Sequence, residues 1–336
     1  MDSVTQMALG AAVGELVLGR RIGNKALLLG AMVGSLPDLD VLVPFEGAIE
    51  SFTYHRSFSH SLIVLSLVSP LIAWVLLKLV RNTEIPFKHW WLMTWLALVT
   101  HPLLDGFTVY GTQLFWPLSE YPVSGSSVFI IDPAFTLILI AGLLFAFRRG
   151  AKGHLINSVA LLLACSYLAW SMVAKKTAHK FIENALAEQG ITYRQLMTTP
   201  MPFNTLGWRF VAMQDNAYRT GYYSLLDPPN NQIKTFAYAS DESLLDSIED
   251  HWPVERLRFF THGFYKVQRI ENEVQMVDLR MGIEKSYIFS FTVGEVTTEG
   301  RVIAVKNREA NSERDFSALK DVMRRVIDPT VDLQQR

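Results

Sequence analysis

Four long apolar runs in the first half of the chain limit what it can fold into. They cover residues 58–80, 89–105, 128–147 and 154–174. Each is close to the roughly 20 residues that an α-helix needs to cross about 30 Å of hydrocarbon at about 1.5 Å per residue. Although 50% of the residues are hydrophobic, 19% are charged, and few of these lie within the runs. The runs therefore predict four membrane-spanning helices.

Two earlier apolar stretches, 4–19 and 26–43, are shorter and carry polar residues and a proline. These are Gln6, Glu15, Pro37, Asp38 and Asp40. Interruptions of this kind are typical of short or half-buried membrane helices. A cleavable secretory signal begins with basic residues, and this N-terminus has none before the first stretch. We therefore expect that helix to be retained. Residues 1–174 are thus predicted to form an α-helical membrane domain with about six short and full-length transmembrane helices.

The second half of the chain has a different character. From Lys175 onward no apolar run is long enough to span a bilayer, and charged residues are spread evenly. β-branched and aromatic residues in partial alternation predict antiparallel strands at 208–213, 218–224, 259–269, 274–280 and 287–293. Helices are predicted at 175–189, 243–250 and 316–327. We expect a soluble α+β domain over residues 175–336, with one sheet and helices packed against it.

Basic residues indicate how the membrane domain is oriented. Nine of them lie in alternate loops: Arg20, Arg21, Lys25, Lys78, Arg81, Lys88, Arg148, Arg149 and Lys152. The other loops, 44–57 and 106–127, contain only Arg56. The positive-inside rule places the nine-charge side in the cytoplasm. An even number of crossings then makes the N-terminus and the C-terminal domain extracytoplasmic, in a multi-pass protein of the inner (cytoplasmic) membrane. The three lysines after the last span count against this orientation, although long domains obey the rule weakly.

Histidines and aspartates gather at the outward ends of the predicted helices, in the segments 34–40, 55–61 and 101–105. His101 and Asp105 are four residues apart, so they project from one face of a helix, as two ligands of one metal ion must. His55 and His60 converge best if His55 lies in a loop and His60 in the first turn of the following helix. Imidazole combined with carboxylate suits zinc, manganese or iron. The pattern predicts one shared polar site.

Taken singly, these residues have simpler interpretations. A lone histidine at a membrane interface is usually just an interfacial polar residue, and an aspartate after a proline usually ends a helix. Asp132 either begins the fifth helix or joins the site. Glu15 is either a buried partner or faces a polar groove. Arg56 either binds an anion such as phosphate or contacts lipid headgroups.

Other classes of function have little support in the sequence. The single cysteine, Cys165, makes an internal disulfide impossible and gives no basis for inferring a Cys-based zinc site. A formal net charge of −1 gives no reason to propose nucleic-acid binding. The expected partners are the bilayer lipids and, because of the position of the polar cluster at the outward helix ends, a lipid or phosphodiester substrate.

The motifs occur in an order that is itself informative. The opening segment 2–15, then Pro37-Asp-Leu-Asp40, His55-Arg-Ser-Phe-Ser-His-Ser61 and His101-Pro-Leu-Leu-Asp105, resemble the YdjM-like family of membrane-bound, metal-dependent hydrolases over roughly residues 1–150. That family is distantly similar to the all-helical zinc phospholipases C and single-strand-specific nucleases, which also use HxxxD ligands. The resemblance implies a set of six metal ligands: Asp38, Asp40, His55, His60, His101 and Asp105.

One position departs from the family pattern. Many members have Thr-His near the N-terminus where this chain has Thr5-Gln6, and glutamine is a poor metal ligand. Either one metal position is lost, or Glu15 or Asp132 compensates.

The sequence therefore predicts a membrane-bound, metal-dependent hydrolase, with zinc as the first choice of metal and manganese as the second. Asp38 or Asp40, if not a ligand, would act as general base, and Arg56 would hold the departing charge. The position of the site favours a lipid or lipid-linked substrate, above all a phosphodiester, at the outer membrane face. The alternative is a non-enzymatic transporter or scaffold in which the polar cluster binds metal or lipid.

Overall fold

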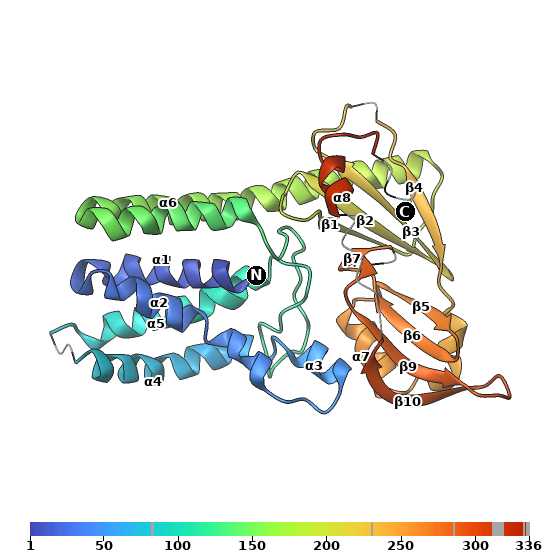
Figure 1. Cartoon of the computed structure of the whole chain (residues 1–336), viewed down its shortest axis with the longest axis horizontal. Coiled ribbons are helices and arrows are strands. Elements are labelled where there is room, and N and C mark those ends of the chain that lie inside the picture. Colours follow the sequence, from blue (N-terminus) through green and yellow to red (C-terminus); the bar gives the residue numbers. More distant parts are fainter. Residues whose placement is uncertain (82–83, 230, 285, 311–318, 332, 334–336) are drawn as a thin grey trace. The chain divides into compact units, whose positions relative to one another are not determined.

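The computed structural model describes residues 1–336 apart from 82–83, 230, 285, 311–318, 332 and 334–336, and it leaves the side chains of 149–151 undescribed. Figure 1 shows a helical N-terminal region followed by a β-rich C-terminal region, in the predicted order. The chain divides into two compact units. Unit 1 comprises Met1–Val43 and Arg56–Met172, and unit 2 comprises Pro44–His55 and Val173–Arg336. Each unit is treated separately below.

Unit 1 is a bundle of helices with two short 3-10 turns. Its elements are α1 (Ser3–Ile22), α2 (Lys25–Gly34), η1 (Pro37–Leu42), η2 (Phe58–His60), α4 (Leu62–Val80), α5 (Phe87–Asp105) and the first part of α6 (Pro133–Glu188). Within α6 the chain doubles back. A Cβ atom added at Gly142 would lie 2.5 Å from the Cβ of Ala160, whereas residues 18 apart in a straight helix are about 27 Å apart.

Two helices in the described part of the chain are long and apolar enough to cross a membrane, Leu62–Val80 and Lys152–Glu188. The prediction of about six spans is therefore wrong in number. The stretch 26–43 is interrupted because α2 ends at Gly34 and a 3-10 turn begins at Pro37, and the run 128–147 becomes helical only at Pro133. Lys25–Gly34 and Pro133–Arg148 remain apolar helices of shorter length.

Glycines allow α1 and α2 to pack backbone against backbone. A Cβ atom at Gly10 would lie 2.4 Å from the carbonyl oxygen of Gly30, and one at Gly34 would lie 2.9 Å from the Cα of Gly10. Small residues at such crossings are typical of helix pairs in membranes. The close approach fixes the C-terminal end of α2 beside the first turns of α1. The 3-10 turn η1 follows directly from this end.

Unit 2 contains two antiparallel four-stranded sheets where the sequence predicted one. The first has the strand order β1-β2-β3-β4, the second has the order β10-β9-β6-β5, and β7 and β8 form a separate pair. The strands are β1 (Gln195–Pro200), β2 (Gly207–Gln214), β3 (Ala217–Ser224), β4 (Thr235–Ala239), β5 (Tyr265–Ile270), β6 (Glu273–Asp278), β7 (Gly282–Ile283), β8 (Ser286–Tyr287), β9 (Ser290–Val296) and β10 (Val302–Glu309).

The described residues of this unit also form short helices: α3 (Ala48–Tyr54), η3 (Glu242–Ile248), α7 (Trp252–Phe260) and α8 (Leu319–Arg325). The predicted helix 243–250 is a 3-10 turn, and the first residues of the predicted strand 259–269 belong to α7. The predicted helix 316–327 contains α8, while its first three positions lie outside the described residues.

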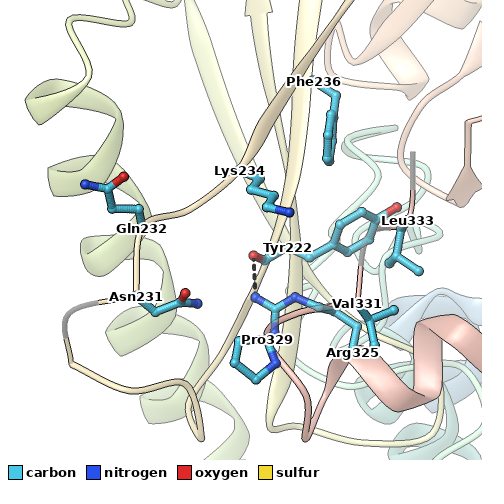
Figure 2. A pocket seen from close by; sticks show the side chains of 9 residues that line it. All are labelled: Tyr222, Asn231, Gln232, Lys234, Phe236, Arg325, Pro329, Val331 and Leu333. Atoms are coloured by element: carbon cyan, nitrogen blue, oxygen red, sulfur yellow. Dashed lines mark hydrogen bonds between the residues drawn. The ribbon is translucent and has the colours of Figure 1, made fainter. Parts of the chain in front are cut away.

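A small cavity of about 40 Å³ lies in unit 2 beside β3 and α8 (Figure 2). Arg325 closes it by donating to the carbonyl oxygen of Tyr222 at 3.2 Å and to both carboxylate oxygens of Asp227 at 2.8 Å. A volume of this size accommodates water molecules and not an organic ligand. The cavity is therefore a part of the packing of this unit.

Candidate metal centre

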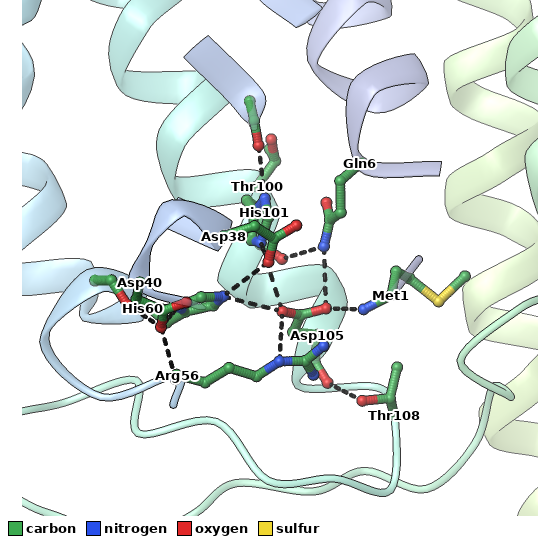
Figure 3. A network of polar contacts seen from close by, with 12 residues as sticks. Met1, Gln6, Asp38, Asp40, Arg56, His60, Thr100, His101, Asp105 and Thr108 are labelled. Carbon is green, nitrogen blue, oxygen red and sulfur yellow. Dashed lines mark hydrogen bonds and ion pairs between the residues drawn. The ribbon is translucent and has the colours of Figure 1, made fainter. Parts of the chain in front are cut away.

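Four side chains from three of the sequence motifs converge in unit 1 (Figure 3). They are Asp38 of η1, His60 of η2, and His101 and Asp105 of α5, and one potential ligand atom of each lies within 4.8 Å of the others. The i, i+4 spacing in α5 brings His101 and Asp105 to one face of the helix, as predicted. The two 3-10 turns present the other two side chains to that face.

The distances between these atoms match those around a small cation. His101 Nε2 lies 3.2 Å from Asp38 Oδ1 and 3.6 Å from Asp105 Oδ2. His60 Nε2 lies 3.6 Å and 3.4 Å from the same two oxygens. Ligands bound at about 2.1 Å to a tetrahedral zinc ion are about 3.4 Å apart. The group therefore has the spacing that such an ion requires.

Burial makes this group unusual. The side chains of His60, His101 and Asp105 are at most 1% exposed, and only that of Asp38 reaches 24%. His101 Nε2 and Asp105 Oδ2 are buried atoms that make no hydrogen bond to any residue the structure describes. Buried polar atoms without a hydrogen bond are costly, and a cation bound among them would satisfy both. The residues present fit a divalent metal.

The ring of His101 is held in the orientation that a metal ligand needs. Its Nδ1 atom lies 2.6 Å from the carbonyl oxygen of Gly34, at the end of α2. Because a carbonyl can only accept, Nδ1 carries the proton, and the lone pair of Nε2 is directed toward Asp38. This type of contact, which fixes the tautomer and the ring, is usual for metal-bound histidines.

Asp40 holds His60 in a comparable way. Its Oδ2 atom accepts hydrogen bonds from the backbone N–H of Arg56 at 2.9 Å and from Ser59 Oγ at 2.6 Å. The Nδ1 atom of His60 is 2.9 Å from Ser59 Oγ and 3.5 Å from Asp40 Oδ2. Asp40 therefore supports the ring of His60 from the side away from the four-residue group. The resemblance implied that Asp40 is itself a ligand, and the geometry gives it this supporting position instead.

His55 was also implied as a ligand. It follows α3 as its C-terminal cap and belongs to unit 2. The four-residue group found among the described residues does not include it.

Arg56 places a buried guanidinium beside the group. The residue is 6% exposed, its Nε atom lies 3.4 Å from Asp105 Oδ2, and its Cζ atom is 5.0 Å from the centre of the Tyr110 ring. The buried Nε and Nη1 atoms make no hydrogen bond to a described residue. A positive φ of 65° is unusual for a non-glycine residue and is commonly retained at functional sites. Arg56 therefore forms a buried ion pair with Asp105 at the edge of the four-residue group.

Gln6 stands where the resemblance led us to expect a histidine. Its Nε2 atom donates to Asp105 Oδ1 at 3.0 Å and to the carbonyl oxygen of His101 at 3.2 Å. The amino group of Met1 also donates to Asp105 Oδ1. Gln6 and Met1 thus orient Asp105, and Oδ2 of this carboxylate remains directed at the two histidines.

Neither of the two residues considered as replacements for that histidine joins the group. Glu15 accepts from Asn157 Nδ2 at 2.7 Å and pairs with His154 Nδ1 at 3.1 Å. Asp132 caps α6 through the N–H of Phe135. His154 is thus the partner of Glu15.

Sequence reasoning missed three contributors to the centre. Ser59 supports His60, Gly34 supplies the carbonyl for His101, and Tyr110 covers Arg56. Ser59 and Gly34 lie within the motif segments, so a search for ring-orienting partners next to each histidine would have found Ser59. Gly34 and Tyr110 act through the backbone or an aromatic face, which no residue pattern encodes.

Comparison with known proteins agrees with the motif order. Residues 1–178 match the family described as YdjM inner membrane protein. The uncharacterized protein YfhP of Bacillus subtilis (strain 168) is 25% identical over 231 residues, which is 66% of this chain and 68% of YfhP. No solved structure matches. Because the family match covers more than half of the 336 residues, the chain belongs to the YdjM family of inner membrane proteins.

Proposed function

We propose that this protein is a membrane-bound, metal-dependent hydrolase whose centre binds one divalent cation at Asp38, His60, His101 and Asp105. The observation that carries the proposal is the buried four-residue group, with spacings of 3.2–3.6 Å between histidine nitrogens and carboxylate oxygens. Two imidazoles and two carboxylates suit zinc best, and manganese next.

A divalent metal at this centre supplies Lewis-acid polarisation of a phosphoryl or acyl oxygen and activation of water. Asp38 faces both histidines through Oδ1, so as a ligand it would bind the metal with that atom and have only Oδ2 left to accept a proton from water; its side chain is 24% exposed. Asp40 is buried and already accepts two hydrogen bonds, so it holds His60 and does not act as the base. Arg56 binds the negative charge of substrate and leaving group through Nη1, while its Nε faces Asp105 Oδ2 at 3.4 Å.

The substrate class follows from the surroundings of the centre. Arg56 favours a phosphodiester, because a guanidinium matches phosphate oxygens in a bidentate geometry. The turn η1, which carries Asp38, also exposes Leu39, Val41 and Leu42, each more than half accessible. Apolar side chains beside a buried polar centre favour a lipid or lipid-linked phosphodiester, approached from the outer membrane face. The C-terminal region is then extracytoplasmic.

The first experiment is metal analysis of the detergent-purified protein after dialysis against metal-free buffer, comparing wild type with His101→Ala. His89→Ala is the matched control, because His89 lies in the same helix and contacts Arg21 at 2.9 Å instead of the centre. We expect about one zinc per chain in wild type and in the control, and none in His101→Ala. A well-folded wild type without metal would refute the proposal.

Hydrolysis is then assayed with a chromogenic phosphodiester and with phospholipid vesicles. Activity that depends on added zinc and is absent in His101→Ala would support the phosphodiester assignment. A zinc-loaded protein that hydrolyses neither substrate would exclude it.

A transporter is the second candidate, and one observation favours it. Glu15, His154 and Asn157 form a partly buried polar group more than two turns along α1 from Gln6, so polar residues are not confined to one end of the bundle. Uptake of zinc into proteoliposomes separates the two candidates. Uptake that is lost in Glu15→Gln would favour transport, whereas hydrolysis without uptake would favour the enzyme.

A further inference from the structure

A segment within the first part of the sequence folds as part of unit 2. This segment, Pro44–His55, contains α3 and is called the strap below. Two of its apolar side chains, Ile49 and Phe52, are at most 5% exposed. The ring of Phe52 lies 4.9 Å from that of Phe260, 4.5 Å from that of Phe289 and 5.1 Å from that of Phe291. The strap is therefore anchored in an aromatic core.

Polar and aromatic contacts fix both ends of α3. At its start, Asn307 of β10 accepts from the N–H of Ile49 at 3.1 Å and donates to Glu50 at 3.4 Å. At its end, Tyr54 stacks on Trp252 at 6.4 Å, and the Arg256 guanidinium lies 4.7 Å from the centre of the Tyr54 ring. A mobile connector would not be held by this many independent contacts.

Both ends of the strap continue directly into the proposed metal centre. Before it comes η1, which carries Asp38 and Asp40, and after it come Arg56 and η2, which carries His60. Asp40 forms hydrogen bonds with the backbone at both ends of the strap. Its carbonyl oxygen accepts from the N–H of Val43 at 3.0 Å, and its Oδ2 accepts from the N–H of Arg56 at 2.9 Å.

The backbone at the second end is also constrained. Arg56 adopts a φ of 65°, which most L-residues avoid, and this conformation directs its N–H to Asp40. A strap released from unit 2 would let this residue relax. The N–H bond to Asp40, and with it the support of His60, would then be lost.

We propose that unit 2 positions the metal centre through the strap, with Phe52 as the positioning residue. The role of unit 2 is thus to hold Asp40 and Arg56 in the geometry that the centre requires. This inference deepens the proposed function, since the centre that it concerns is the one on which that function rests. It also gives a reason why the membrane bundle carries a β-rich unit.

The test compares Phe52→Ala with Phe52→Leu and with Met213→Ala in the full-length protein in detergent. Met213 is 2% exposed in a different core of unit 2, beside Val211 and Tyr218, so its truncation destabilises the unit without touching the strap. The first readout is hydrogen exchange of peptides covering residues 36–43 and 56–62, at a temperature where all variants are folded. This readout does not depend on metal.

We expect Phe52→Ala to exchange about tenfold faster in both peptides, whereas Phe52→Leu and Met213→Ala stay at the wild-type rate. Unchanged exchange in Phe52→Ala would overturn the proposal. Equal acceleration in Met213→Ala would overturn it too, because the effect would then be one of general stability.

Cobalt is titrated into the same proteins as a spectroscopic substitute for zinc. We expect Phe52→Ala to bind cobalt at least about tenfold more weakly than wild type, with an altered absorption spectrum. Wild-type affinity and spectrum in Phe52→Ala would overturn the proposal. If wild type binds no more cobalt than His101→Ala does, the proposed metal centre fails, and the exchange measurement still decides whether the strap positions Asp40 and Arg56.

Discussion

The Nδ1 atom of His101 lies 2.6 Å from the carbonyl oxygen of Gly34, so the end of α2 fixes the ring of a proposed metal ligand on α5. Gly34 can lie there because α1 and α2 approach each other at glycines. A Cβ atom at Gly34 would be 2.9 Å from the Cα of Gly10. The packing of one helix pair thereby controls the orientation of a side chain on a third helix.

The first prediction concerns this contact. Gly34→Val forces α1 and α2 apart, moves the carbonyl away from His101 and should weaken cobalt binding by about tenfold or more. Met32→Ala is the control on the same helix, since Met32 is 56% exposed and does not lie in the crossing. Titration of both variants by absorbance checks the prediction. Equal cobalt affinities in Gly34→Val and Met32→Ala would show that the packing of α1 on α2 does not affect the metal centre.

The second prediction concerns the support of His60. Asp40→Asn replaces a carboxylate that accepts from the N–H of Arg56 and from Ser59 with a neutral amide, so it should lower the affinity for zinc about 10- to 100-fold. Competition with a chromophoric chelator measures this change. Asp215→Asn, at a side chain that is 88% exposed, should leave the affinity unchanged. If Asp40→Asn bound zinc as wild type does, Asp40 would have no part in holding the ligand.

The third prediction concerns Arg56. Lysine cannot present two donors in a fixed plane, so Arg56→Lys should lower kcat/KM for a phosphodiester by about tenfold or more, while the bound zinc stays at the wild-type level. Steady-state kinetics and metal analysis of one preparation check both parts. Full activity in Arg56→Lys would mean that the guanidinium does not contact the substrate. Loss of zinc as well would mean that Arg56 supports the centre and not the substrate.

The fourth prediction is a pH dependence of unit 2. Burial raises the pKa of Glu284, but hydrogen bonds from Lys266, Tyr218 and Tyr287 outweigh it and hold the pKa below its ordinary value of 4.5. A lowered folded-state pKa contributes stability that is complete above pH 4.5 and is lost as the pH falls through the folded value.

Hydrogen exchange of β2 and β3 peptides over this acidic range measures that loss. We expect wild-type protection, after correction for the intrinsic pH dependence of exchange, to fall as the pH drops below 4.5, and Glu284→Gln to be less protected near neutrality and less sensitive to acid. An identical acid profile in the two proteins would assign the loss to other carboxylates.

The sequence predicted those features that depend on short-range spacing. The helical region followed by a β-rich region follows from hydropathy and alternation, and the common face of His101 and Asp105 follows from the 3.6-residue period of a helix. The difference between Asp38 and Asp40 could not be predicted. Two residues apart in a 3-10 turn, they point in different directions, and the turn itself was not evident from the apolar stretch 26–43.

Features that depend on distant partners were also missed. Nothing within residues 44–57 reveals that Phe52 packs on Phe260, Phe289 and Phe291, more than 200 positions later. The number of spans was overestimated because hydropathy alone does not register where a helix stops. Both the packing of Phe52 and the ends of the helices depend on tertiary structure, which local composition does not specify.

The strap has a consequence for how the protein is made. A ribosome completes the N-terminal helices and all four proposed metal ligands early, but Phe289, Phe291 and Asn307 of the strap's anchor emerge only near the end of synthesis. Until then Phe52 has no aromatic core to pack against. The strap is not docked, so α3 does not yet hold Asp40 and Arg56 in place. A nascent chain would therefore carry the proposed ligands before the centre is fully formed. It would become able to bind metal only after the last strands have been synthesised.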